Sequence, residues 1–445
     1  MSARRVLVVA SHFPPAGGGG IQRTVALVRR LCEQGWDVRV LTRPADRQFL
    51  PEDGYFASRV PAGIEVRSAR PWRWNLPLRL LGRAGLPSLE AAATRFFSVP
   101  DDHIGWIPPA AREGTALLRE RAADAIYATA PKHAGHWVGR ILARRFSLPL
   151  VLDFRDDFVG NPMVPIPTPL HRRLMLRLER RLLSGADRAV FNTPAMEEDY
   201  HARYPDLASR FTNVPNGFEP ADLGEALAPV ARRAGPCRIL ASGSIYGARD
   251  LAPILRALAE ALRAGTIPAD GVRLDLCGVH WTNDLPLPAA LAGLVRIHGF
   301  VPRDHLLRLY RDADLLLSCE DPVRTTAVPG KIYEHLALGR RILFVGAPRG
   351  AVTDLLREAG VGETVHPADA EGLRRSLAAA ACEVLRGTPP ERAPLAFLER
   401  YRRAALSERL EGILLEAIRG RAPVSAGPPT PPPGASSAPT LPIPA

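Results

Sequence analysis

Lys331 and Glu334 have the chemistry and the spacing of a site for a phosphorylated ligand. They lie in the segment 328–343, which begins Val-Pro-Gly-Lys-Ile-Tyr-Glu-His and continues into an apolar strand. The pattern predicts a helix that begins near Lys331, and a helix N-terminus attracts anions. The lysine ammonium adds a full positive charge, and a carboxylate one turn later can accept hydrogen bonds from sugar hydroxyls. The segment therefore favours a pocket for a nucleotide diphosphate-sugar, with an ordinary capped helix as the alternative.

Four consecutive glycines form a second candidate site for phosphate. They stand in the loop 11–20, between an apolar strand and a helix predicted over 21–34. Glycines there allow backbone N–H groups to approach a phosphate closely. A nicotinamide-dependent enzyme would use the same device, but its second strand should end near an acidic residue, and here Arg43 follows instead. A flexible turn is the remaining alternative. The residues are Gly17, Gly18, Gly19 and Gly20.

Charged residues also end the strand predicted over 150–154. Asp153, Arg155 and Asp156 would lie at its carboxyl end, where parallel α/β sheets bind ligands. They would contact a ligand in the cleft or brace neighbouring loops, and the sequence favours neither role over the other.

Two histidines, His133 and His136, open a helix after another predicted strand. An H-x-x-H pair is compatible with a metal, but a third ligand at recognisable spacing is missing. We therefore predict no metal site. A plain role at the surface or at the start of the helix is the alternative for each histidine.

The second half of the chain contains a further candidate loop. Ser244 and Arg249 follow a strand predicted over 238–241. Arginine binds phosphate through two parallel hydrogen bonds. The alternative for Arg249 is a solvated surface position.

Taken together, these motifs resemble those of retaining glycosyltransferases of the family-4 type. Segment 328–343 is similar to the donor-site motif of that family, loop 12–20 to its F-P-P-x-x-G-G motif, and segment 153–158 to its D-x-R-D-x-W motif, with Phe158 in place of tryptophan. The resemblance covers about residues 4–420. It implies transfer of a sugar from a nucleotide diphosphate-sugar to a glycan, a lipid-linked saccharide or a small molecule. It further implies retention of configuration, no metal and no cofactor beyond the sugar donor.

The resemblance also implies roles for single residues. Glu334 would hold the ribose hydroxyls, whereas Lys331, Arg249 and the glycine loop would stabilise charge on the leaving diphosphate. His136 would face the reacting sugar, since it matches the histidine of the family better than His133 does.

The chain departs from the family pattern at two positions. Thr326 stands where the first of two glutamates is usual, and Ser244 stands where an arginine is usual. Because fold alone does not guarantee activity, two alternatives stay open. One is a nucleotide-sugar epimerase or hydrolase of the same fold, and the other is a non-catalytic nucleotide-sugar-binding or scaffold protein.

The order of the predicted elements divides the chain into two α/β domains. A length of 445 residues exceeds one ordinary core, and strands alternate with helices in two series. The resemblance implies the GT-B class, two doubly wound Rossmann-like domains that face each other across a cleft. We expect an acceptor-side domain, a donor domain, a helix that crosses back to the first domain and a disordered Pro-rich tail, over residues 1–218, 219–396, 397–421 and 422–445.

Composition restricts the compartment and the partners. No apolar segment approaches the roughly 20 residues that span a bilayer, and the five cysteines are isolated, so we expect a cytoplasmic protein with reduced thiols. The net charge of +12 favours anionic partners. We find no run of alternating arginines and aromatic residues of the kind that stacks bases, however, so we expect no nucleic-acid binding. The basic helix 170–183 and the Trp- and Arg-containing segment 71–86 are candidates for peripheral contact with the inner membrane face.

Overall fold

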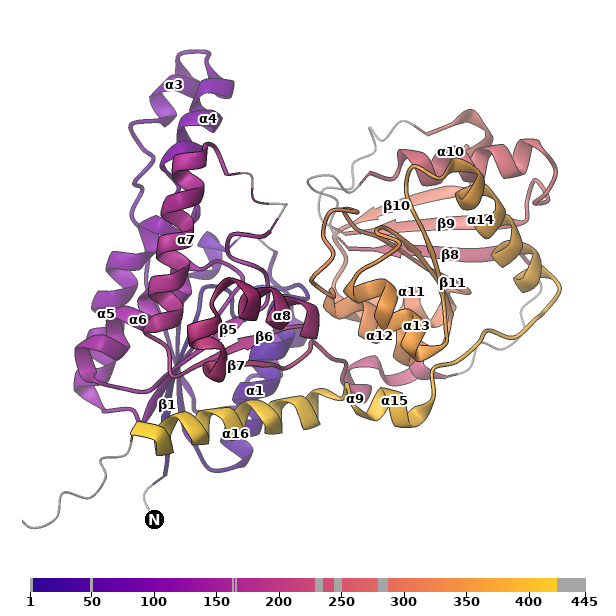
Figure 1. The fold of residues 1–445 in the computed structure, drawn as a ribbon. Coiled ribbons are helices and arrows are strands. Elements are labelled where there is room, and N and C mark those ends of the chain that lie inside the picture. Colours follow the sequence, from indigo (N-terminus) through magenta and orange to yellow (C-terminus); the bar gives the residue numbers. More distant parts are fainter. Residues whose placement is uncertain are drawn as a thin grey trace, which may run out of the picture.

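The computed structural model of the chain contains two parallel β-sheets, one in each half of the sequence (Figure 1). It describes residues 3–48, 51–161, 164, 166–228, 235–243, 250–278 and 287–421. Helices cover the sheets in each domain, which confirms the expected class of two doubly wound domains. The tail 422–445 lies outside the described residues.

The first sheet has seven parallel strands in the described part of the chain, in the order β3-β2-β1-β4-β5-β6-β7. The strand order changes direction between β1 and β4, and open α/β sheets bind ligands at the carboxyl ends of such strands. In chain order, the strands are β1 (Arg5–Ala10), β2 (Asp37–Thr42), β3 (Glu65–Ser68), β4 (Ala125–Thr129), β5 (Leu150–Phe154), β6 (Arg188–Phe191) and β7 (Phe211–Asn213).

Both faces of this sheet are buried over its central strands, which explains the nearly continuous apolar runs of those strands; the edge strand β3 is partly exposed. Val6 and Val8 of β1 pack in one cluster with the apolar side of α1. Leu7 and Val9 pack in the other cluster, on the opposite face. The helices of this domain are α1 (Gln22–Glu33), α2 (Gly54–Ala57), α3 (Arg79–Arg83), α4 (Pro87–Phe97), α5 (Ile107–Glu120), α6 (Ala134–Phe146), α7 (Pro169–Ser184) and α8 (Pro194–Arg203).

The second sheet has six parallel strands within the described residues, in the order β10-β9-β8-β11-β12-β13. Its change of direction falls between β8 and β11. The strands are β8 (Cys237–Ser242), β9 (Val272–Cys277), β10 (Val295–Gly299), β11 (Leu315–Cys319), β12 (Arg341–Val345) and β13 (Glu363–Val365). The helices that follow the first sheet in the chain are α9 (Pro220–Leu223), α10 (Ala252–Arg263), α11 (Arg303–Asp312), α12 (Gly330–Leu338), α13 (Ala351–Ala359), α14 (Ala370–Leu385), α15 (Leu395–Glu399) and α16 (Arg403–Arg421).

The chain crosses between the domains twice, and the two crossings lie side by side. The N–H of Phe218 donates to the carbonyl of Tyr401 (3.0 Å), and the N–H of Arg403 donates to the carbonyl of Phe218 (2.9 Å). A Cβ at Gly217 would lie 2.2 Å from the Tyr401 carbonyl oxygen, so only glycine permits this approach.

The helix expected over 397–421 is in fact two helices, α15 and α16. Helix α16 runs along the first domain beside α1 (Figure 1). Its Glu411 accepts hydrogen bonds from the Trp36 indole (3.0 Å) and from the Arg30 guanidinium (3.0 Å). Its apolar residues share a core cluster with β1 and α1. No helix in the described ranges is long and apolar enough to cross a bilayer.

Candidate functional site

A cavity of about 1440 Å³ lies between the two domains, at the carboxyl ends of both sheets. Both domains contribute to its walls, and most of the predicted site residues within the described chain lie on them. Those on the walls are Gly18, Gly19, Gly20, His133, Arg155, Asp156, Lys331 and Glu334. Ser244 and Arg249 lie outside the described residues.

Lys331 lies where α12 begins and β8 ends. Its Nζ donates to the carbonyl of Ser242, the last residue of β8 (3.2 Å), and lies 3.5 Å from the Glu320 carboxylate. Gly243 follows at φ +119°, and a Cβ there would approach the lysine Nζ to 3.2 Å. The structure thus brings the ammonium, the helix N-terminus and the end of the strand to one point on the cavity wall.

Glu334 is buried and held by Arg303, a residue that no motif of the sequence marks. The two carboxylate oxygens accept hydrogen bonds from the two terminal nitrogens of Arg303 (3.0 and 2.9 Å). Burial alone would raise the pKa of Glu334, but the charge and hydrogen bonds of Arg303 outweigh it, so the pKa is lowered. The guanidinium of Arg403, at the start of α16, lies 3.7 Å from the same carboxylate.

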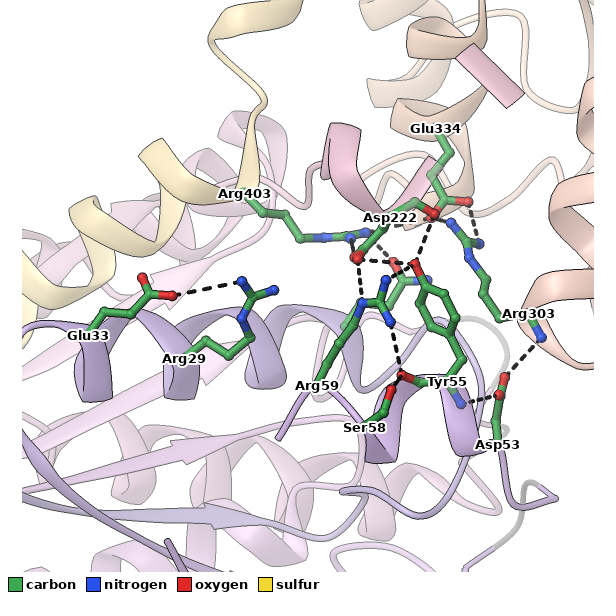
Figure 2. A network of polar contacts seen from close by, with 11 residues as sticks. Arg29, Glu33, Asp53, Tyr55, Ser58, Arg59, Asp222, Arg303, Glu334 and Arg403 are labelled. Carbon is green, nitrogen blue, oxygen red and sulfur yellow. Dashed lines mark hydrogen bonds and ion pairs between the residues drawn. The ribbon is translucent and has the colours of Figure 1, made fainter. Parts of the chain in front are cut away.

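This pair belongs to a larger polar network that joins the two domains (Figure 2). Asp222 of α9 accepts hydrogen bonds from Arg59 (2.8 Å) and Tyr55 (3.2 Å) of the first domain and pairs with Arg403 (3.4 Å). The backbone N–H of Arg303 donates to Asp53 (3.2 Å). Segments of both domains and of the returning helix therefore fix the position of Glu334.

The four glycines of the loop have two different environments: the first packs against a neighbouring segment, and the other three line the cavity. The N–H of Gly17 donates to the Pro51 carbonyl (2.8 Å), and a Cβ at Gly17 would lie 2.9 Å from Cβ of Asp53. Gly17 is buried against this segment and is not among the cavity-lining residues, whereas the three following glycines are. The guanidinium of Arg155 donates to the carbonyls of Gly20 and Gly19.

Asp153 lies in the core behind the cavity. It is fully buried and forms an ion pair with Arg23 of α1 (2.8 Å). The hydroxyls of Tyr127 (2.7 Å) and Thr129 (2.9 Å) also donate to it. Its contacts are those of a brace between α1 and the sheet, the second of the two roles expected for it.

Asp156, by contrast, faces the cavity and makes an ion pair across it. Its partner is Arg324 of the second domain, which also lies 3.5 Å from Glu320. The cleft is crossed nearby by a hydrogen bond from the Asn216 amide to the Val328 carbonyl (3.2 Å). Thr326, at the place of the absent glutamate, accepts a hydrogen bond at its carbonyl from the Thr193 hydroxyl.

The two histidines differ in their access to the cavity. His133 lines it, whereas His136 is fully buried behind it, with Nε2 3.1 Å from the Asp153 carbonyl and Nδ1 3.2 Å from Nδ1 of His133. Burial lowers the pKa of His136 to about 4, so it is neutral at pH 7. The geometry favours His133 over His136 for contact with a ligand. Within the described chain, no three His, Cys, Asp or Glu side chains are grouped so that they could hold a metal.

Both lysines of the chain line the cavity. The sequence contains 58 lysines and arginines, and Lys132 and Lys331 are its only lysines. Lys132 has φ +77°, an unusual value for a residue other than glycine, and its Nζ lies 2.6 Å from Asp102. A strained backbone at a cavity wall is typical of functional positions.

Comparison with known proteins agrees with this geometry. Residues 18–217 match the family model described as a glycosyl transferase 4-like domain. A search of curated proteins gives no match.

Solved structures of the same fold cover nearly the whole chain. Sucrose-phosphate synthase from Thermosynechococcus elongatus has a TM-score of 0.64 at 16% identity, covering 94% of this chain and 100% of its own. Anabaena HepE in complex with UDP-glucose has a TM-score of 0.56 at 15% identity, covering 93% and 99%. A putative UDP-N-acetylglucosamine 2-epimerase from Listeria monocytogenes has a TM-score of 0.55 at 12% identity, covering 95% and 98%. The chain thus has the GT-B fold, and its first domain is similar to glycosyl transferase 4-like domains.

Proposed function

We propose that the protein is a glycosyltransferase that moves a sugar from a nucleotide diphosphate-sugar to an acceptor held mainly by the first domain. The observation that carries this proposal is the position of Lys331, at the N-terminus of α12 on the cavity wall and one turn before Glu334. The UDP-glucose in the HepE structure, which shares the fold, supports a nucleotide-sugar as the donor.

In this proposal Lys331 and the start of α12 bind the diphosphate. Negative charge develops on that group as its bond to the anomeric carbon breaks, and fixed cations and helix N–H groups stabilise it. The acceptor oxygen forms the new bond to the anomeric carbon and gives its proton to an oxygen of the departing diphosphate. Attack on the face that the diphosphate leaves gives a product of retained configuration.

Glu334 would hold the ribose of the donor. Arg303 occupies one lone pair on each carboxylate oxygen, and an ionised carboxylate has about four such acceptor positions. The Gln22 side chain and the Arg403 guanidinium also interact with this carboxylate, so a ribose hydroxyl would use an acceptor position that these groups leave. Arg303 therefore presents the carboxylate to a ligand in a fixed orientation.

Cations of the site would take the place of a metal. Besides Lys331, the cavity is lined by Arg43, Lys132 and Arg155 of the first domain and by Arg324 of the second. We expect transfer to continue in the presence of a chelator, without a cofactor other than the sugar donor.

The second candidate function is that of an epimerase or a hydrolase, because the putative epimerase described above has the same fold. An epimerase or a hydrolase would consume the nucleotide-sugar without an acceptor. Turnover that requires an acceptor alcohol would exclude both.

The first test is calorimetry with UDP, GDP, ADP and dTDP in the presence of a chelator. We expect one nucleotide to bind selectively and Glu334→Gln to weaken it tenfold or more, about 1.4 kcal/mol. Glu358→Gln, an exposed acid of the second domain, is the matched control and should have no effect. If no nucleotide binds to the folded native protein, the scaffold hypothesis replaces the enzyme.

A further inference from the structure

A projecting arm of the first domain exposes large apolar side chains. We define the arm as residues 71–97, which include α3 and α4, together with residues 169–177 at the start of α7; Figure 1 shows α3 and α4 extending beyond the rest of the domain. Nine of the sixteen large hydrophobic side chains exposed in the described chain lie on this arm. Examples are Leu170 (69% exposed), Trp72 (63%), Leu80 (61%) and Phe97 (56%).

The charge of the arm is predominantly positive. It contains seven arginines, all exposed, and Glu90 is its only acidic residue. None of the seven has an acidic partner within ion-pair distance among the described residues. They are Arg73, Arg79, Arg83, Arg95, Arg172, Arg173 and Arg177.

Contacts at both ends of the arm fix its position on the domain, and its apolar side chains are exposed in that position. The N–H of Trp72 donates to the Gly105 carbonyl (2.8 Å), and a Cβ at Gly105 would lie 2.4 Å from the Trp72 oxygen. At the other end, Nε2 of His171 lies 2.9 Å from the Phe96 carbonyl, and the two rings are 4.5 Å apart.

We propose that the arm is a docking surface for a bilayer that contains anionic lipids. The free energy falls when apolar and aromatic side chains enter the interfacial region, and arginines beside them bind anionic headgroups. This pairing of leucine, phenylalanine and tryptophan with an excess of positive charge fits a lipid surface.

Docking would also orient the active cleft. Arg79, Glu90 and Arg95 of the arm line the interdomain cavity, and they do so on the same segment that carries the exposed leucines. A bilayer bound to the arm lies at the first-domain end of the cavity, the end assigned to the acceptor.

The test is co-sedimentation of the full chain with vesicles, without nucleotide-sugar, so that it is independent of transfer activity. Vesicles of phosphatidylcholine alone are compared with vesicles that also contain phosphatidylglycerol. We expect binding to the anionic vesicles that weakens at high salt. Two variants should each lower the partition coefficient about tenfold or more: Leu80→Ser/Leu89→Ser/Phe97→Ser, and Arg83→Gln/Arg172→Gln/Arg173→Gln.

Matched controls lie on the second domain, where Leu395→Ser (77% exposed) and Arg357→Gln remove an exposed leucine and an exposed arginine. Neither should change vesicle binding, and all variants should keep the native unfolding temperature. Equal binding to neutral and anionic vesicles would overturn the role of the arginines. Absence of vesicle binding would overturn the proposal, and a dimer that the leucine variant dissociates would assign the arm to a second copy of the chain.

Discussion

The guanidinium of Arg303 and the carboxylate of Glu334 form a bidentate pair, with both side chains only 4% exposed. Removal of one partner from such a pair leaves a buried charge without its main compensation. The pair lies on the cavity wall, so it contributes both to the stability of the second domain and to the shape of its candidate ligand site.

Arg303→Gln should therefore reduce the free energy of unfolding by about 3 kcal/mol, because Glu334 stays buried and charged. Nucleotide affinity should fall as well, since the carboxylate loses its fixed orientation. Urea denaturation and calorimetry measure the two effects. Arg311→Gln, on the same helix and 41% exposed, should change neither. A variant at 303 with native stability would show that Arg403 alone compensates Glu334.

Asp153 should behave as a structural residue. Asp153→Asn removes the charge that Arg23 needs in the core and should cost about 3 kcal/mol of unfolding free energy, while the folded protein keeps its nucleotide affinity. Asp156→Asn is the comparison, because Asp156 faces the cavity and is 28% exposed. It should reduce turnover at a smaller cost in stability. A loss of nucleotide affinity in Asp153→Asn without a loss of stability would instead place Asp153 in the ligand site.

The doubly wound fold could be predicted from local patterns in the sequence. Apolar strands alternating with amphipathic helices predict parallel sheets, and the sheets then bring the ends of strands together. Lys331 and Glu334 were found for the same reason, since the start of a helix after a proline is readable from a few neighbouring residues.

The partners of buried charges could not be predicted from the sequence, because they come from distant parts of the chain. Arg303 and Glu334 are 31 residues apart, and Tyr55 and Asp222 are 167 apart. Nothing local distinguishes Arg303 among 58 basic residues. Likewise, Gly17 and Gly18 are equivalent in the sequence, but in the structure Gly17 packs against the 51–53 segment and Gly18 has φ +91°.

Stability should fall as the pH is lowered from 7 to 4, in part through His136. Burial lowers its pKa to about 4, against about 6.5 in an unfolded chain. Between these values the unfolded chain binds the extra proton, so the free energy of unfolding decreases as pH falls, by about 3 kcal/mol for this residue. His136→Gln should make the pH dependence shallower by about one proton in this window. His201→Gln, a substitution of a half-exposed histidine, is the control; an unchanged slope in His136→Gln would mean that this ring is already protonated in the native protein.

Lys132 should show a conflict between stability and activity. At φ +77° any side chain with a Cβ is strained, so Lys132→Gly should be more stable than Lys132→Ala by about 1 kcal/mol, the reverse of their usual order. Both variants remove the ammonium from the cavity wall, and both should lose transfer activity to the same extent. Thermal unfolding and initial rates at saturating donor separate the two effects. Lys331→Gln is the contrasting variant, because it should reduce turnover about a hundredfold without any gain in stability. Full activity in Lys132→Gly would assign this lysine to the ion pair with Asp102 alone, whereas activity lost without the stability difference would place the backbone of the native protein outside the left-handed region.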